Sequence, residues 1–87
     1  MDELTMYTAG WCPDCRRVKN FLKDRGIVFQ EVNIEENEEA EALVIRVNHG
    51  KRKVPTLKFG DRYFACSPFN SQQLADELRI PLNTPRP

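Results

Sequence analysis

Residues 4–15 read Leu4-Thr5-Met6-Tyr7-Thr8-Ala9-Gly10-Trp11-Cys12-Pro13-Asp14-Cys15, and this stretch decides the fold. Its first five residues alternate and are rich in strand formers, and Ala9-Gly10 then breaks the pattern. Pro13 suits the first turn of a helix, because the backbone N–H that proline lacks has no partner there. Apolar residues then recur at helical spacing until Gly26, at Val18, Phe21 and Leu22. The stretch predicts a strand, a loop and a helix from about Pro13 to Arg25.

A second strand and a second helix follow. Apolar residues of one parity, Val28, Val32 and Ile34, indicate a strand from about Val28 to Asn33. The acidic run from Glu35 to Glu41 is typical of a solvated helix start. An apolar stripe then continues the helix until Asn48-His49-Gly50, through Ala40, Leu43, Val44 and Val47.

A hairpin and a third helix complete the pattern. Val54 to Phe59 and Arg62 to Cys66 read as two strands around a tight turn at Gly60-Asp61. Asn70 or Ser71 then caps a helix that carries Leu74 and Leu78. The order βαβαββα predicts an α/β fold, in which a four-stranded mixed sheet is flanked by three helices.

Length and charge limit the classes of function. The 87 residues permit one domain, for which we expect residues 1–80, followed by a mobile Pro-rich tail at 81–87. Lys and Arg number 13, as do Asp and Glu, so the chain lacks the basic field that nucleic acid or an anionic membrane requires. Neither a membrane span nor the regions of a signal peptide are apparent. We expect a cytoplasmic monomer that acts on small molecules or proteins.

The cysteines indicate redox chemistry or metal binding. There are three, and the close pair Cys12 and Cys15 does not resemble the framework of a secreted, disulfide-stapled protein. At a strand-to-helix junction, the unsatisfied N–H groups of the helix favour an anion on the first sulfur. Cys12 is therefore expected to be the acidic, exposed nucleophile and Cys15 the shielded resolving thiol. Half of a zinc site, a bridging iron-sulfur cluster and a chance spacing remain alternatives.

Other residues provide context for the pair. Trp11 offers a flat apolar surface beside the reactive sulfur, or else packs as a half-buried side chain. Asp14 suits the first helical turn but opposes a neighbouring thiolate. Val54-Pro55 is a candidate cis bond that would present the Val54 backbone to an extended substrate. Cys66 is expected to be a small, partly buried filler, and His49 a polar loop residue.

Together these residues resemble the glutaredoxin family. The motifs that carry the resemblance are Tyr7-Thr8, Trp11-Cys12-Pro13-Asp14-Cys15, Val54-Pro55-Thr56 and the late Cys66, and they span roughly residues 4 to 79. The chain is most similar to the mycoredoxin-like branch, through Glu31-Val32-Asn33-Ile34-Glu35, Val47-Asn48, Val54 to Phe59 and Ser67-Pro68. The resemblance implies a thioredoxin-like fold and a thiol-disulfide oxidoreductase. We expect no tightly bound cofactor and no metal, because only Cys66 and His49 remain as further ligands.

The resemblance also implies a substrate groove and a partner. The groove residues would be Trp11, Pro13, Asp14, Lys53, Val54, Pro55, Cys66 and Ser67, beside a redox-active Cys12–Cys15 disulfide. A low-molecular-weight thiol would be the co-substrate and disulfide-containing proteins the targets. The chain differs from glutathione-using members at Ala9, Asp14 and Phe64-Ala65, so mycothiol and bacillithiol are considered beside glutathione.

Three other functions stay open at this point. The first is a redoxin recharged by a thioredoxin reductase, which donates electrons to ribonucleotide reductase. The second is an iron-sulfur or metal carrier that uses Cys12 and Cys15 as ligands. The third is an inactive binding module that retains the fold.

Overall fold

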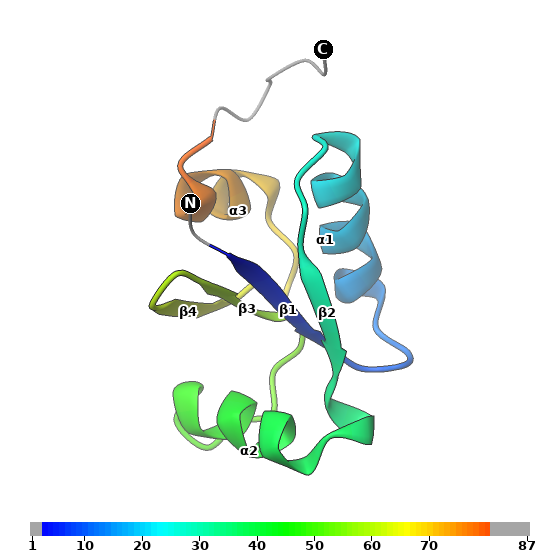
Figure 1. The fold of residues 1–87 in the computed structure, drawn as a ribbon, viewed down its shortest axis with the longest axis vertical. Helices are drawn as coiled ribbons and strands as arrows, with labels where there is room; N and C mark the ends of the chain where they lie inside the picture. The colour runs from blue at the N-terminus through cyan, green and yellow to red at the C-terminus, as the bar shows by residue number, and fades with distance from the viewer. Residues whose placement is uncertain (1–2, 81–87) are drawn as a thin grey trace.

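The computed structural model describes residues 3–80, which form an α/β domain (Figure 1). Along the chain, its strands and helices are β1 (Leu4–Thr8), α1 (Pro13–Asp24), β2 (Gln30–Asn33), the short 3-10 helix η1 (Ile34–Glu36), α2 (Glu38–Val47), β3 (Thr56–Phe59), β4 (Arg62–Ala65) and α3 (Ser71–Leu78). The predicted order βαβαββα is confirmed, with η1 as an addition. No helix within 3–80 is long and apolar enough to cross a membrane.

The four strands of the described domain form one mixed sheet in the order β2-β1-β3-β4. β1 pairs in parallel with β2, as a crossover through α1 requires. It pairs antiparallel with β3, which in turn forms the hairpin with β4. β1 is thus central, and the loop that follows it leads directly to Cys12.

Helices cover both faces of the sheet (Figure 1). α1 and α3 pack on one face, over a core of fully or nearly fully buried residues that includes Met6, Leu22, Leu57 and Leu74. α2 packs on the other face, where Ala40 and Val44 meet Ile34, with Tyr7 and Val32 beside them. The alternation in β1 explains this division, since successive side chains of a strand point to opposite faces.

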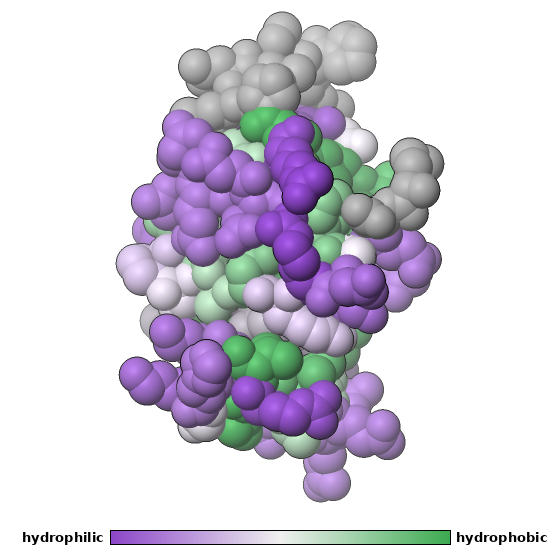
Figure 2. Space-filling model, turned by 90° about the vertical axis from the view of Figure 1, so that its left-hand side faces the viewer, coloured by the Kyte–Doolittle hydropathy of each residue, from purple (hydrophilic) through white to green (hydrophobic). Residues whose placement is uncertain are grey.

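The surface on one side of the molecule is largely hydrophilic (Figure 2). Figure 2 looks at the molecule from the side on which β4 lies, and hydrophilic side chains dominate its upper half. Apolar side chains are visible between them, and again lower down at the level of α2. Single apolar residues on a surface are ordinary, and the large ones most exposed within 3–80 are Trp11 and Val28.

The second predicted strand was wrong at its start. It begins at Gln30, and Val28 is 89% exposed. The reason lies in the end of α1, where Ile27 N–H donates to Leu22 O at 2.9 Å and brings Ile27 to the core. Phe29 also packs on that core, so the intervening Val28 points to solvent.

Other boundaries differ by one or two residues. β3 begins at Thr56 rather than Val54, because Pro55 has no N–H to donate to the neighbouring strand. The side chain of Asn70, not Ser71, caps α3 by accepting the Gln73 N–H at 2.9 Å. The predicted tail at 81–87 lies outside the described residues.

Candidate active site

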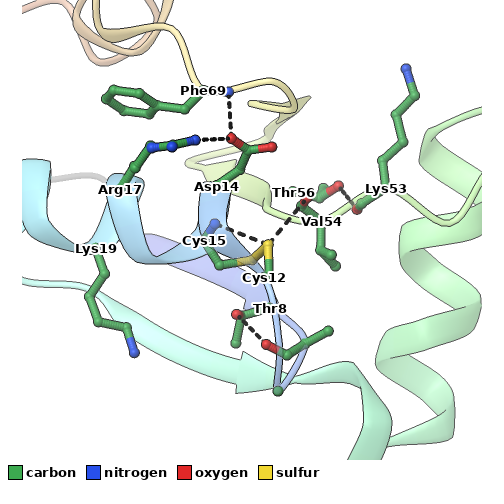
Figure 3. Close-up of a disulfide and its surroundings, with 12 residues drawn as sticks. Thr8, Cys12, Asp14, Cys15, Arg17, Lys19, Lys53, Val54, Thr56 and Phe69 are labelled. Atoms are coloured by element: carbon green, nitrogen blue, oxygen red, sulfur yellow. Dashed lines mark hydrogen bonds and ion pairs between the residues drawn. A yellow bond between two sulfur atoms is a disulfide. The ribbon is translucent and has the colours of Figure 1, made fainter.

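The cysteine pair lies where β1 leads into α1. Cys12 and Cys15 are joined by a disulfide, with their Cα atoms 5.2 Å apart (Figure 3). Cys12 is the N-cap of α1: its backbone is extended, and its Sγ accepts the Cys15 N–H at 3.0 Å. Pro13 occupies the first turn, as the sequence predicts. The helix thus directs an otherwise unpaired N–H at the Cys12 sulfur, which favours a thiolate there after reduction.

The two cysteines differ in their access to solvent. Cys15 is 3% exposed, whereas Cys12 is only partly buried. A disulfide in solution can therefore reach Cys12 more readily than Cys15. Cys15 stays within bonding distance of Cys12, as a resolving thiol requires.

The segment before β3 flanks the pair on one side. The Val54–Pro55 peptide bond is cis, as the sequence suggests, and the Val54 carbonyl oxygen lies 3.7 Å from Cys12 Sγ. Thr56 fixes this segment, because its buried hydroxyl donates to Lys53 O at 2.7 Å and accepts from Asn48 Nδ2 at 3.0 Å. Two residues 42 positions apart in the chain thus face each other at the site.

Asp14 makes contacts within the chain. Its Oδ1 accepts the Phe69 N–H at 3.1 Å and lies 3.2 Å from Arg17 Nη1 (Figure 3). Its side chain is 24% exposed, against 62% for Arg17. Of the two arginines after the motif, Arg17 therefore offsets the Asp14 charge, and Arg16 is exposed.

A polar pocket of about 420 Å³ adjoins both sulfurs. Its lining consists of the end of β1, the first turns of α1 and residues near β2, namely Thr8, Ala9, Gly10, Cys12, Cys15, Arg16, Lys19, Glu31, Asn33 and Glu36. Lys19 and Glu31 form an ion pair across it at 2.8 Å. A larger hollow of about 630 Å³ beside α2 includes neither cysteine, so we place the chemistry at the polar pocket.

Two residues near this pocket, Thr8 and Glu35, were not predicted as site residues. Thr8 is a buried polar residue, 5% exposed, on the strand that precedes the motif. Glu35 Oε1 accepts the Gly10 N–H at 2.7 Å, and a Cβ at position 10 would lie 2.9 Å from that oxygen. A glycine is therefore favoured there, and the only sequence signal was Gly10 itself at the end of a strand.

The remaining predicted groove residues lie around the pair with very different exposure. Trp11 is 85% exposed, and Pro13, Lys53 and Ser67 are also exposed. Cys66 is fully buried in the core, beyond the partial burial expected for it, and its backbone N–H donates to Pro55 O at 2.9 Å. Burial raises the pKa of the Cys66 thiol, so this side chain remains protonated at neutral pH.

Within residues 3–80, no group of three or more His, Cys, Asp or Glu side chains is arranged to hold a metal ion. His49 lies in the turn after α2, exposed and with a positive φ of 59°, as expected of a loop residue.

Comparisons with known proteins show the family to which the chain belongs. The family model described as Glutaredoxin matches residues 4–64. A protein of Mycobacterium tuberculosis that carries a glutaredoxin name is 42% identical over 79 residues, which cover 91% of this chain and 88% of that protein. Mycoredoxin 1 of Corynebacterium glutamicum is 33% identical over 75 residues, covering 86% of this chain and 92% of the relative.

Solved structures share the fold. The glutaredoxin-like protein NrdH-redoxin of Escherichia coli, described as having a thioredoxin-like activity profile, superposes with a TM-score of 0.62 at 30% identity. That match covers 72% of this chain and 80% of the other. Structures of further glutaredoxins and of a thioredoxin-like protein match as well. The chain therefore belongs to the glutaredoxin family of the thioredoxin superfamily, whose members are thiol-disulfide oxidoreductases.

Proposed function

We propose that this protein reduces protein disulfides and mixed disulfides through its Cys12–Cys15 dithiol, with a low-molecular-weight thiol as the recycling co-substrate. The observation that carries the proposal is the position of Cys12. Its sulfur caps α1, accepts the Cys15 N–H and lies beside the Val54 carbonyl, while Cys15 is buried behind it. The Cys12 sulfur is thus accessible to a substrate, and Cys15 lies close enough to attack a mixed disulfide on Cys12.

The proposed reaction has two exchange steps. The Cys12 thiolate attacks one sulfur of a substrate disulfide, so that a Cys12 mixed disulfide forms and the other substrate thiolate leaves and takes up a proton. Cys15 then loses its proton and attacks Cys12 Sγ. The second substrate thiol leaves. The substrate disulfide has then gained two electrons, and Cys12 and Cys15, which have lost them, are joined in a disulfide. Two small thiols, oxidised to their own disulfide, restore the dithiol.

The groove for the substrate lies between the exposed side chains around Cys12. Trp11 and Pro13 are exposed and would provide apolar surface, and the exposed Lys53 would provide a cation. The Val54 and Pro55 backbone and the Cys66-Ser67 turn complete the groove. For Cys66 only the backbone takes part in this proposal, because its side chain is buried.

The co-substrate distinguishes two candidate functions. Similarity to mycoredoxin 1 favours a small thiol, of which mycothiol, bacillithiol and glutathione are the candidates. Similarity to NrdH-redoxin favours a thioredoxin reductase as the electron source, with ribonucleotide reductase or a similar enzyme as acceptor. We favour the small thiol, because the run Val54-Pro55-Thr56-Leu57 resembles the mycoredoxin-like branch more than it resembles the redoxins. The cytoplasm is the proposed compartment, since it supplies either reductant.

A turnover assay tests this choice. Purified protein is given a protein mixed disulfide and either NADPH with thioredoxin reductase or one of the three thiols with its own regenerating system. Turnover with a thiol supports the proposal, and turnover only with the reductase replaces it by the second candidate. Cys12→Ser should abolish activity in either system, whereas full activity of that variant would assign the chemistry to another site.

A trapping experiment identifies the partner directly. Cys15→Ser removes the resolving thiol, so that the mixed disulfide on Cys12 accumulates. The mass joined to Cys12 in cells then names the small thiol or the protein target. Stoichiometric iron or zinc in the wild-type protein purified without oxygen would favour the carrier function instead.

A further inference from the structure

We propose that Asp14 is a positioning residue, which holds the segment Cys66–Asn70 against the first turn of α1 and so shapes one wall of the substrate groove. The proposal rests on the proposed function, because it assigns a role at the same groove. It gives Asp14 a task different from the direct contact with substrate that is expected from its place in the motif.

The contact itself is specific and long-range. Asp14 Oδ1 accepts the backbone N–H of Phe69, 55 residues away in the chain, at 3.1 Å. Asp14 is the third residue of the cysteine motif, so this bond joins the motif directly to the segment that precedes α3 (Figure 3).

The segment is anchored at each end by other contacts. At one end, Cys66 N–H donates to Pro55 O, which ties it to the residues beside Cys12. At the other end, the side chain of Asn70 caps α3. Gln73 of α3 reaches back to the first end, where its Nε2 donates to Ala65 O at 2.9 Å. The middle, Ser67 and Pro68, is exposed, and Pro68 has no N–H to donate.

Phe69 therefore supplies the attachment of the exposed middle to α1. Its ring meets Phe21 of α1 edge to face, with centroids 6.3 Å apart, and its N–H meets Asp14. An aromatic contact allows sliding of the ring, whereas the hydrogen bond fixes the distance between the backbone and the motif. Loss of the Asp14 acceptor should thus free Ser67 and Pro68 to move relative to Cys12.

Three variants distinguish the effect of the Asp14–Phe69 hydrogen bond from the effect of the Asp14 charge. Asp14→Asn keeps an oxygen that accepts the Phe69 N–H and removes the charge. Asp14→Ala removes both. Arg17→Ala is the matched control, since it removes the ion pair and leaves the Asp14 acceptor in place.

Two substrates distinguish an effect on substrate binding in the groove from an effect on the reactivity of Cys12. A peptide mixed disulfide is long enough to lie along the groove, whereas bis(2-hydroxyethyl) disulfide reports mainly on Cys12. With the peptide, Asp14→Ala should raise KM about fivefold, the effect of losing a hydrogen bond of ordinary strength, at little changed kcat. Asp14→Asn and Arg17→Ala should stay within about twofold of the wild type on KM, as expected for a surface ion pair. With the small disulfide, Asp14→Asn and Asp14→Ala should have similar kcat/KM to each other, because both remove the same charge beside Cys12.

Other outcomes overturn the proposal. If Asp14→Asn and Asp14→Ala raise KM equally, the charge of Asp14 matters and its position does not. If the pH profile of Cys12 alkylation shifts in both variants and the two substrates are affected alike, Asp14 acts on the sulfur. A wild type that reduces neither disulfide contradicts the proposed function instead.

Amide hydrogen exchange gives an independent readout that does not need a folded alanine variant. The Phe69 amide should be protected in the wild type and in Asp14→Asn. Exchange of this amide at the rate of an open backbone in the wild type would overturn the proposal whatever the activity assays show.

Discussion

Replacing Thr56 by valine tests how the segment beside Cys12 is held. The side chain is 1% exposed, and valine has nearly the same shape, so the change removes a hydroxyl without leaving a cavity. Two hydrogen bonds are lost, to Lys53 O at 2.7 Å and from Asn48 Nδ2 at 3.0 Å. Asn48 Nδ2 retains its bond to Val44 O at 2.7 Å, which limits the damage.

The loss of two bonds at the usual net value each gives a decrease of about 2 kcal/mol in the free energy of unfolding. For a domain of this size, that corresponds to a fall of about 8 to 16 °C in Tm. The variant should also have a lower kcat/KM for disulfide reduction, because Lys53 and Val54 lose an anchor beside Cys12.

Urea unfolding followed by circular dichroism measures the stability, and thermal unfolding gives Tm. Thr5→Val is a matched control, since the half-buried Thr5 in β1 makes no side-chain hydrogen bond within residues 3–80. Its effect should be within about 0.5 kcal/mol. Equal effects of the two substitutions would refute the reasoning. A double-mutant cycle with Asn48→Ala should show a coupling of at least about 0.5 kcal/mol between Thr56 and Asn48.

Three further predictions concern stability. Burial raises the pKa of Cys66 above its ordinary 9.0, so the folded protein holds this proton more tightly than the unfolded chain does. The free energy of unfolding therefore falls as pH rises above about 9. In urea titrations across that pH range, Cys66→Ala should show a smaller fall. Leu57→Ala should cost about 2–5 kcal/mol, because Leu57 is fully buried, and Val28→Ala almost nothing by the same assay. Asn70→Ala should cost about 1 kcal/mol in thermal unfolding, and no loss would mean that the cap of α3 is dispensable.

Much of the local structure could be predicted because its signals are local. The helix at Pro13 follows from proline in a first turn and from apolar spacing, and α3 follows from a cap and two leucines. Val28 was misjudged because its parity matched Val32, yet the turn after α1 placed Ile27 and Phe29 on the core instead. The periodicity of apolar residues alone does not show at which residue a strand begins to pair with its neighbour in the sheet.

The sequence by itself determined the cysteine pair, its place between a strand and a helix, and the order of the elements, since neighbouring residues carry all of these. Only the tertiary structure decided what surrounds the pair. The Val54 carbonyl reaches Cys12 because β3 lies next to β1 in the sheet, and Phe69 reaches Asp14 because α1 and α3 pack on the same face. Contacts between residues so far apart depend on the packing of whole elements, which no single stretch of sequence specifies.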